Sequence, residues 1–94
     1  MNIIGFIWHE KIIEKLEQKH NVLQYEVREV FENDPKFRYV EKGLQPDENV
    51  YAAFGRAISG RYLIIFFIYK TDKKALVVSA RDMTRAERKK YEEK

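Results

Sequence analysis

The chain has 94 residues, too few for two cores of ordinary size, so we expect a single domain over residues 1–94. Hydrophobic residues make up 45% and charged residues 35%, a mixture typical of a folded chain. Cysteine is absent, which excludes disulfides and thiolate zinc sites, and the two histidines show no metal-ligand spacing. The net charge of +3 mildly favours an anionic partner such as RNA or an acidic peptide.

Targeting signals are not evident in the sequence. Met1–Gly5 lacks the basic and then apolar layout of a signal peptide. The longest apolar run, Leu63–Tyr69, is far shorter than the roughly 20 residues of a membrane span. We therefore expect a cytoplasmic protein with no membrane segment. We also expect no cofactor and no metal.

The N-terminal third predicts a strand followed by two helices. Ile3–Trp8 is short and apolar, which is typical of an edge strand. Glu10–His20 has apolar residues at helical spacing, and Asn21 accepts the left-handed conformation that ends helices. A second helix is expected from about Val22 to Glu32, where Asn33-Asp34-Pro35 stops it because the residue before proline avoids the helical region.

The middle of the chain changes from helical spacing to alternation. Phe37–Tyr39 alternates with charged residues and predicts a half-exposed strand. Val50–Ile58, Arg61–Lys70 and Ala75–Ser79 predict three further strands. The turns between these three are too short for a crossover, so the strands must be antiparallel.

The dipeptide Ser59-Gly60 fits a two-residue hairpin turn, in which Ile58 would pair with Arg61. That register puts small residues beside large ones on one face of the sheet and leaves room there for a helix. The small residues are Ala53, Gly55 and Ala57, and the large ones are Tyr62, Ile64 and Phe66.

The last segment predicts a helix that begins near Thr84. Thr84 and Glu87 have the spacing of a capping box, in which each side chain binds a backbone N–H of the first turn. The predicted order is a strand, two helices, an antiparallel meander and a helix, so the fold class is α+β.

Four features occur in an order and at spacings that resemble the family of BrnT-type toxins. They are Phe6-x-Trp8 followed by Lys19-His20-x-Val22; Val30-Phe31; Gly55 with Gly60-Arg61; and Ser79-Ala80-Arg81 followed by Thr84-Arg85-x-Glu87-Arg88 and Tyr91. The resemblance covers nearly the whole chain and implies a RelE-like fold. It also implies a ribonuclease that inhibits translation and a small cognate antitoxin protein, in an even-numbered hetero-oligomer.

Metal-free RNA cleavage needs a base for the attacking 2′-hydroxyl, an acid for the leaving oxygen, and cations for the added negative charge. His20 is the first candidate for proton transfer; alternatively, it only bonds the last carbonyls of its helix. Lys19 could stabilise a phosphate or be a solvated lysine. Arg81 suits bidentate phosphate contact, or forms a salt bridge with Asp82 or an acidic residue of the first helices. We expect Lys19, His20 and Arg81 to be catalytic and to meet at one rim of the sheet.

The basic tract Arg85, Arg88 and Lys89 is expected to bind RNA, or else to form the solvated face of a helix with Arg88 and Glu92 as an i, i+4 pair. Glu87 is better explained by the capping box than by catalysis.

A second function stays open from the sequence: a non-catalytic RNA- or protein-binding module of the same fold. The BrnT-type pattern commonly has basic residues where this chain has Asn49 and Leu76, which favours the module. Lys19-His20 and Ser79-Ala80-Arg81 favour the ribonuclease.

Overall fold

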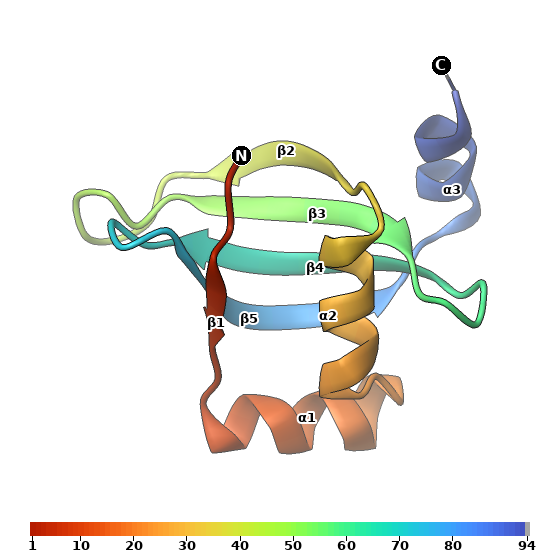
Figure 1. The fold of residues 1–94 in the computed structure, drawn as a ribbon, viewed down its shortest axis with the longest axis horizontal. Coiled ribbons are helices and arrows are strands. Elements are labelled where there is room, and N and C mark those ends of the chain that lie inside the picture. The colour runs from red at the N-terminus through yellow and green to blue at the C-terminus, as the bar shows by residue number, and fades with distance from the viewer. Residues whose placement is uncertain (94) are drawn as a thin grey trace.

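A computed structural model describes residues 1–93 of the chain (Figure 1). Within them a small sheet is combined with three helices. The elements in chain order are β1 (Gly5–Ile7), α1 (Glu10–His20), α2 (Gln24–Glu32), β2 (Lys36–Glu41), β3 (Val50–Arg56), β4 (Tyr62–Tyr69), β5 (Lys74–Asp82) and α3 (Arg85–Glu92).

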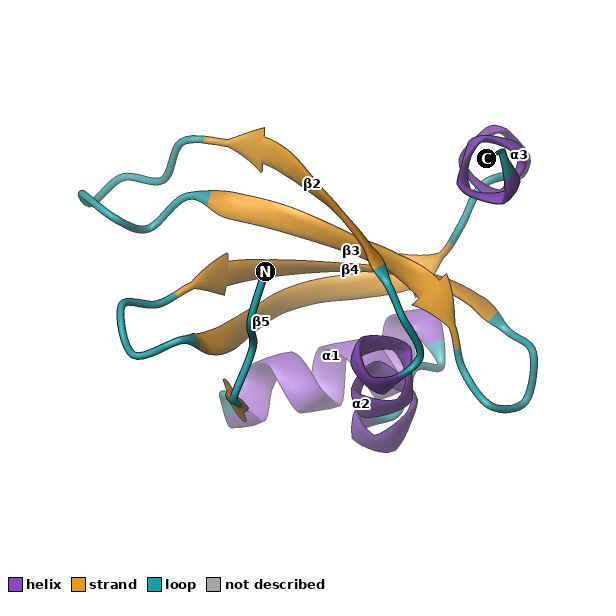
Figure 2. Cartoon of the chain, turned by 45° about the horizontal axis from the view of Figure 1, so that its top comes forward, coloured by secondary structure: helices purple, strands orange, loops and turns teal. Residues whose placement is uncertain are grey.

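The sheet has five strands in the order β1-β5-β4-β3-β2. β1 pairs in parallel with β5, and every other pair is antiparallel, which confirms the predicted meander and the α+β class. The helices α1 and α2 lie against one face of this sheet, whereas α3 lies beyond the other face at the end of β5 (Figure 2). The two faces therefore have different surroundings.

Both N-terminal helices are confirmed. α1 has the predicted bounds, and Asn21 after it adopts the left-handed conformation with φ 52° and ψ 41°. α2 begins at Gln24 rather than at Val22, because the N–H of Val22 donates to the Leu16 carbonyl and closes the end of α1. Val22 is buried in the core as a result.

The predicted register of the β3–β4 hairpin is wrong. The N–H of Ala57 donates to the Arg61 carbonyl at 2.9 Å, and the N–H of Gly60 donates to the Ala57 carbonyl at 2.9 Å, so Ile58–Gly60 forms a three-residue loop. Gly60 has a φ of +96°, which suits the last position of such a loop, whereas Ser59 lacks the positive φ that a two-residue type I′ turn would also require.

The different loop length moves the small residues to the other set of neighbours. Gly55 lies opposite Leu63, and Ala53 lies opposite Ile65, instead of opposite the alternating positions predicted. A shift by one residue exchanges the faces of a strand, because side chains alternate with a period of two. The expected helix above the small residues is nevertheless present, because α2 packs against β3 there.

The face of the sheet against which α1 and α2 lie is here called the covered face. The core fills the space between this face and the two helices. Its largest fully buried side chains are Phe67, Leu16, Leu63, Ile65, Val22, Val27, Val30 and Val77. Phe67 is also surrounded by aromatic rings, with Phe31 at 5.3 Å and Phe37 at 6.0 Å between ring centroids.

β5 continues to Asp82, beyond the predicted end at Ser79. Arg81 is therefore part of the strand and does not follow it, and a register shift opposite Phe66 and Phe67 sets which face its side chain takes.

The predicted capping box of α3 is confirmed, since Thr84 Oγ1 accepts from the Glu87 N–H at 3.1 Å and Glu87 Oε1 accepts from the Thr84 N–H at 2.8 Å.

Within residues 1–93, no helix combines the length and the apolar content that crossing a membrane requires.

We expect Gly55→Ala to lower the free energy of unfolding by about 1–3 kcal/mol. A Cβ at this position would lie 2.9 Å from Cγ1 of the buried Val30, whose β-branched side chain has little freedom to move. Urea unfolding measures the change. Gly5→Ala is the control, because its nearest neighbour would be the flexible Lys74 side chain at 3.7 Å. Equal stability of the two variants would contradict close packing of α2 on β3.

Candidate functional site

The face of the sheet opposite α1 and α2, here called the open face, is apolar but carries two arginines. Phe54, Ile64 and Phe66 alternate along β3 and β4 with the core residues of the covered face. Arg38 of β2 pairs with Ala52, and Arg81 of β5 pairs with Ile64, so both arginines lie on this face. Together with Glu87 they border a hollow of about 280 Å³.

A second hollow, the α3 groove, lies between α3 and the adjoining ends of β2 and β3. Its volume is about 410 Å³. It shares Arg38, Phe54 and Glu87 with the first hollow, so the two are continuous. Its lining includes Lys36, Arg38, Phe54, Glu87, Lys90 and Tyr91.

Arg81 and Glu87 form a bidentate ion pair where the two hollows meet. Arg81 Nη1 donates to Glu87 Oε1 at 2.7 Å, and Nη2 donates to Oε2 at 3.0 Å. The guanidinium also lies 5.6 Å from the centroid of the Phe66 ring. The bond from Arg81, helped by the Thr84 N–H and opposed by burial, lowers the pKa of Glu87 to about 2. Glu87 therefore both caps α3 and holds Arg81.

Three further cations line the α3 groove. Lys36 Nζ donates to the carbonyls of Tyr91 and Glu93 and lies 5.1 Å from the centroid of the Tyr91 ring. Arg38 and Lys90 form no hydrogen bond or ion pair with any residue of 1–93 and are exposed. The groove thus offers positive charge above an apolar floor, which suits an anionic ligand with flat apolar groups.

One end of the open face is closed by a stack of side chains around Tyr62. Arg56 lies 4.5 Å and Arg88 3.9 Å from the centroid of the Tyr62 ring, and Tyr91 meets it edge to face at 6.1 Å. Arg88 also pairs with Glu92 at 3.5 Å, which confirms the i, i+4 pair expected from the sequence. These contacts fix α3 against the sheet although none of its residues is buried.

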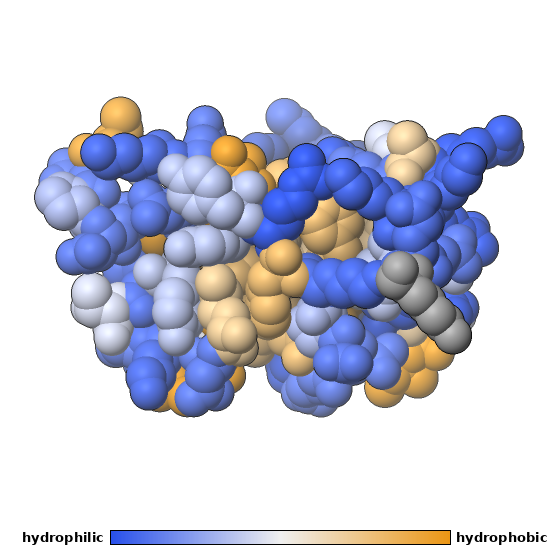
Figure 3. Space-filling view, turned by 90° about the horizontal axis from the view of Figure 1, so that it is seen from above, coloured by the Kyte–Doolittle hydropathy of each residue, from blue (hydrophilic) through white to orange (hydrophobic). Residues whose placement is uncertain are grey.

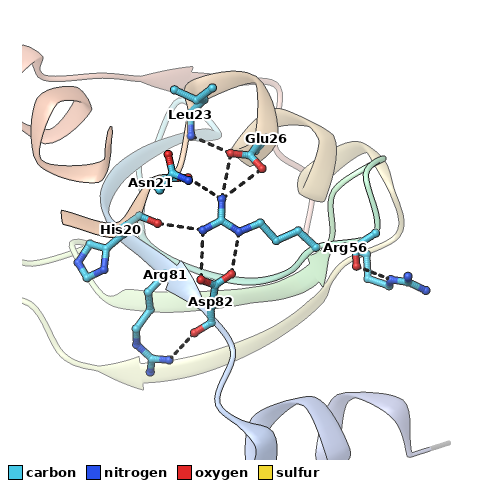
Figure 4. A network of polar contacts seen from close by, with 9 residues as sticks. His20, Asn21, Leu23, Glu26, Arg56, Arg81 and Asp82 are labelled. Carbon is cyan, nitrogen blue, oxygen red and sulfur yellow. Dashed lines mark hydrogen bonds and ion pairs between the residues drawn. The ribbon is translucent and has the colours of Figure 1, made fainter. Parts of the chain in front are cut away.

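Lys19 and His20 lie at the end of α1, beside a network centred on Arg61. Four groups surround one guanidinium in Figure 4: the carbonyls of His20 and Asn21 and the carboxylates of Glu26 and Asp82. The His20 ring points away from this guanidinium (Figure 4). The hydrogen bond from Arg61 is the main cause that lowers the pKa of Asp82, and the positive charges of Arg61 and His20 add to it.

The structure brings the predicted catalytic residues to the same end of the sheet but not into one hollow. Arg61 binds both Asp82 and the His20 carbonyl, and Asp82 is the chain neighbour of Arg81. The backbone of Arg81 is therefore close to His20. The Arg81 side chain then takes the open face, while α1 covers the other face. The lining of the α3 groove does not include Lys19 or His20. Arg81 does form a salt bridge, but its partner is Glu87 of α3 and not Asp82 or an acidic residue of the first helices, as the sequence led us to expect.

Of the predicted RNA-binding residues, Arg85 and Lys89 lie on the outer side of α3, away from the groove, whereas Arg88 stacks on the Tyr62 ring of the sheet. Arg85, Arg88 and Lys89 border a shallow hollow of about 480 Å³ together with Glu92 and Glu93. Sequence reasoning missed Lys36, Arg38 and Lys90 as parts of a site. The alternation of Lys36 and Arg38 with apolar residues in β2 was visible, but only the fold shows that α3, with Lys90, faces them.

Within residues 1–93, no three histidine, aspartate or glutamate side chains gather in a way that could hold a metal ion. The charged groups that the groove itself provides are those of lysine, arginine and one glutamate.

We expect Arg81→Met to raise the pKa of Glu87 from about 2, while the bonds from Thr84 keep it below its ordinary value. A carboxyl whose pKa is lowered on folding adds stability above its unfolded pKa and loses it as the pH falls through the folded value. The wild-type protein should therefore lose stability between about pH 4.5 and about pH 2, and Arg81→Met should lose less. An NMR titration of the Glu87 carboxyl, with Lys89→Met as control, measures the shift. An unchanged Glu87 pKa in Arg81→Met would contradict the pair.

The model of one protein family, described as the ribonuclease toxin BrnT of type II toxin–antitoxin systems, matches residues 8–87. The match begins directly after β1 and ends within α3, and it includes both Arg81 and Glu87. A search of curated proteins finds no match. A toxin of this type has an antitoxin protein as its partner. Because the family model covers most of the chain, this protein belongs to the BrnT family of ribonuclease toxins of type II toxin–antitoxin systems.

Proposed function

We propose that this toxin cleaves RNA in the α3 groove without a metal ion, and that the loss of RNA inhibits translation. The observation that carries the proposal is the bidentate pair of Arg81 and Glu87 between two cation-lined hollows. Arginine has the planar fork of donors that fits a phosphate as well as a carboxylate. A phosphate in the groove can therefore replace Glu87 as the partner of Arg81.

The same exchange supplies a base for the reaction. Once a phosphate binds Arg81, the Glu87 carboxylate is free to accept the proton of the 2′-hydroxyl. The 2′-oxygen then bonds to phosphorus, and the bond from phosphorus to the 5′-oxygen breaks. Arg81 and Arg38 stabilise the extra negative charge on the phosphate oxygens.

The leaving 5′-oxygen takes a proton from an ammonium group of the groove. Lys90 is the one available, because Lys36 is bound to the carbonyls of Tyr91 and Glu93. The flat rings of Phe54 and Tyr91 line the same groove and give the neighbouring bases a surface for stacking.

Lys19 and His20 enter this proposal as contacts outside the groove. They lie at the end of α1, next to Asp82, where an RNA strand that passes round the end of β5 would meet them. In that position Lys19 stabilises a phosphate, and His20 is a second candidate for proton transfer. Arg85 and Lys89 bind the phosphates of the RNA on the outer side of α3, and Arg88 does so beside the Tyr62 ring on which it stacks.

We expect purified wild-type toxin to cleave RNA in the presence of EDTA and to leave 2′,3′-cyclic phosphate and 5′-hydroxyl ends. Arg81→Met and Glu87→Gln should each slow cleavage by on the order of a hundredfold or more, since each removes a charge-stabilising or proton-accepting group. His20→Ala should have a smaller effect. Single-turnover cleavage of a labelled RNA measures all three rates.

Lys11→Met is the control, because this exposed lysine is at the start of α1, at the other end from His20. Two results would contradict the proposal. Cleavage that EDTA abolishes would exclude the metal-free route, and a loss in His20→Ala as large as in Arg81→Met would assign the proton transfer to His20. RNA binding without any cleavage would favour a non-catalytic module.

We expect replacement of both Arg85 and Lys89 by Ala to weaken RNA binding and to reduce its salt dependence. Each phosphate contact that is lost should lower the slope of log affinity against log salt by about 0.7 for single-stranded RNA. Fluorescence anisotropy at several salt concentrations, with the Glu87→Gln protein to prevent cleavage, measures this slope. An unchanged slope would show that the outer side of α3 does not contact the RNA.

A further inference from the structure

β2 (Lys36–Glu41) is the outermost strand of the sheet, and no other strand of residues 1–93 lies beside its far edge. It pairs only with β3, so half of its backbone N–H and C=O groups point away from the sheet. All of its residues except Phe37 are exposed. An edge of this kind is a ready template for another extended chain.

The two sides of β2 differ in chemistry. Lys36 and Arg38 point toward the open face and line the α3 groove. Phe37 and Tyr39 alternate with them and belong to the aromatic cluster of the other side, through Phe67 and Tyr51. Tyr39 is still 53% exposed and the following Val40 is 42% exposed, so this edge presents apolar surface to solvent.

The guanidinium of Arg38, on the groove side of β2, has no ion-pair partner among residues 1–93. The carboxylate that lines the groove is Glu87, and Arg81 already binds both of its oxygens. Figure 3, seen from the β2 side, shows apolar residues in the middle of the surface with hydrophilic residues around them. A partner for this edge must therefore bring carboxylates on one side and apolar groups on the other.

We propose that the antitoxin binds as an added strand along β2. The bound segment has acidic residues at alternating positions, which face Lys36 and Arg38, and apolar residues between them, which cover Phe37 and Tyr39. Main-chain hydrogen bonds to β2 give affinity, and the alternate side chains give specificity. The partner is the antitoxin because the family provides one, and the strand is argued from the free edge of β2 and the charges beside it.

This arrangement also explains inhibition, and here alone it rests on the proposed function. Carboxylates beside Lys36 and Arg38 occupy the place of the RNA phosphates in the α3 groove. Antitoxin and RNA then exclude each other by competing for the same cations, and no movement of α3 is needed.

The test is hydrogen exchange of the full-length toxin with and without its antitoxin, together with affinities measured by interferometry. The β2 amides that point outward should become protected on binding. Arg38→Glu and Tyr39→Lys should each weaken binding at least about tenfold, and Lys42→Glu, an exposed lysine just past the end of β2, should not. Unfolding curves of the variants verify that they fold.

Unprotected β2 amides in a saturated complex would overturn the proposal. It would also be overturned if free toxin protected the same amides as its concentration rises, because a second copy would then occupy the edge. The proposal for the ribonuclease site can fail separately from the proposal for β2. Arg81→Met should bind antitoxin as the wild-type protein does, whether or not the wild-type protein cleaves RNA. If Arg38→Glu lost cleavage but kept full affinity for antitoxin, RNA alone would use this edge.

Discussion

The guanidinium of Arg61 joins the ends of four elements. It binds the carbonyls of His20 and Asn21 where α1 ends, Glu26 in the first turn of α2, and Asp82 at the end of β5, and Arg61 itself directly precedes β4. Glu26 is only 8% exposed, so without Arg61 a carboxylate would remain in the interior without its cation, which is costly. Because Asp82 is held from one side, its neighbour Arg81 is directed to the other. The ion pair thus fixes both the helix layer and the direction of the groove arginine.

The two faces of the sheet have different roles, since one packs the core and the other carries the candidate site. Its covered face carries the small residues Ala53 and Gly55, which let α2 approach, and the large residues Leu63, Ile65 and Phe67, which fill the core. Its open face has apolar residues at the centre and charged groups at the end near α3. Substitutions on the open face can therefore change charge and ligand binding without reaching the core, and this makes charge-reversal variants informative.

The groove wall formed by α3 depends on polar contacts. None of the residues of α3 is buried, and the helix is held by the Arg81–Glu87 pair, the Lys36 bonds to its last carbonyls, and the stack around Tyr62. Partly exposed contacts of this kind are weakened by salt and by titration more than apolar packing is. The low pKa of Glu87 keeps its carboxylate charged at all physiological pH values, so the pair persists until a competing anion reaches Arg81.

The sequence by itself determined the elements that depend on local physics. The spacing of apolar residues predicted α1 within its observed bounds, Asn21 ended that helix, and the Thr84–Glu87 spacing located the start of α3. These features depend on neighbours a few residues apart. The motif order led to the family, and it also pointed to Arg81, whose place in the α3 groove follows from the fold.

Only the tertiary structure decided which residues meet. The Ser59-Gly60 turn looked like a two-residue loop, and one additional loop residue exchanged the faces of β3 and β4 relative to each other. Likewise Lys19, His20 and Arg81 were expected to meet at one rim, whereas the Arg81 side chain lies on the open face, because the face that it takes depends on the register shift in β5. Lys36, Arg38 and Lys90 became one groove only because α3 folds back over β2 and β3. Contacts between distant segments depend on register and packing, which local periodicity does not contain.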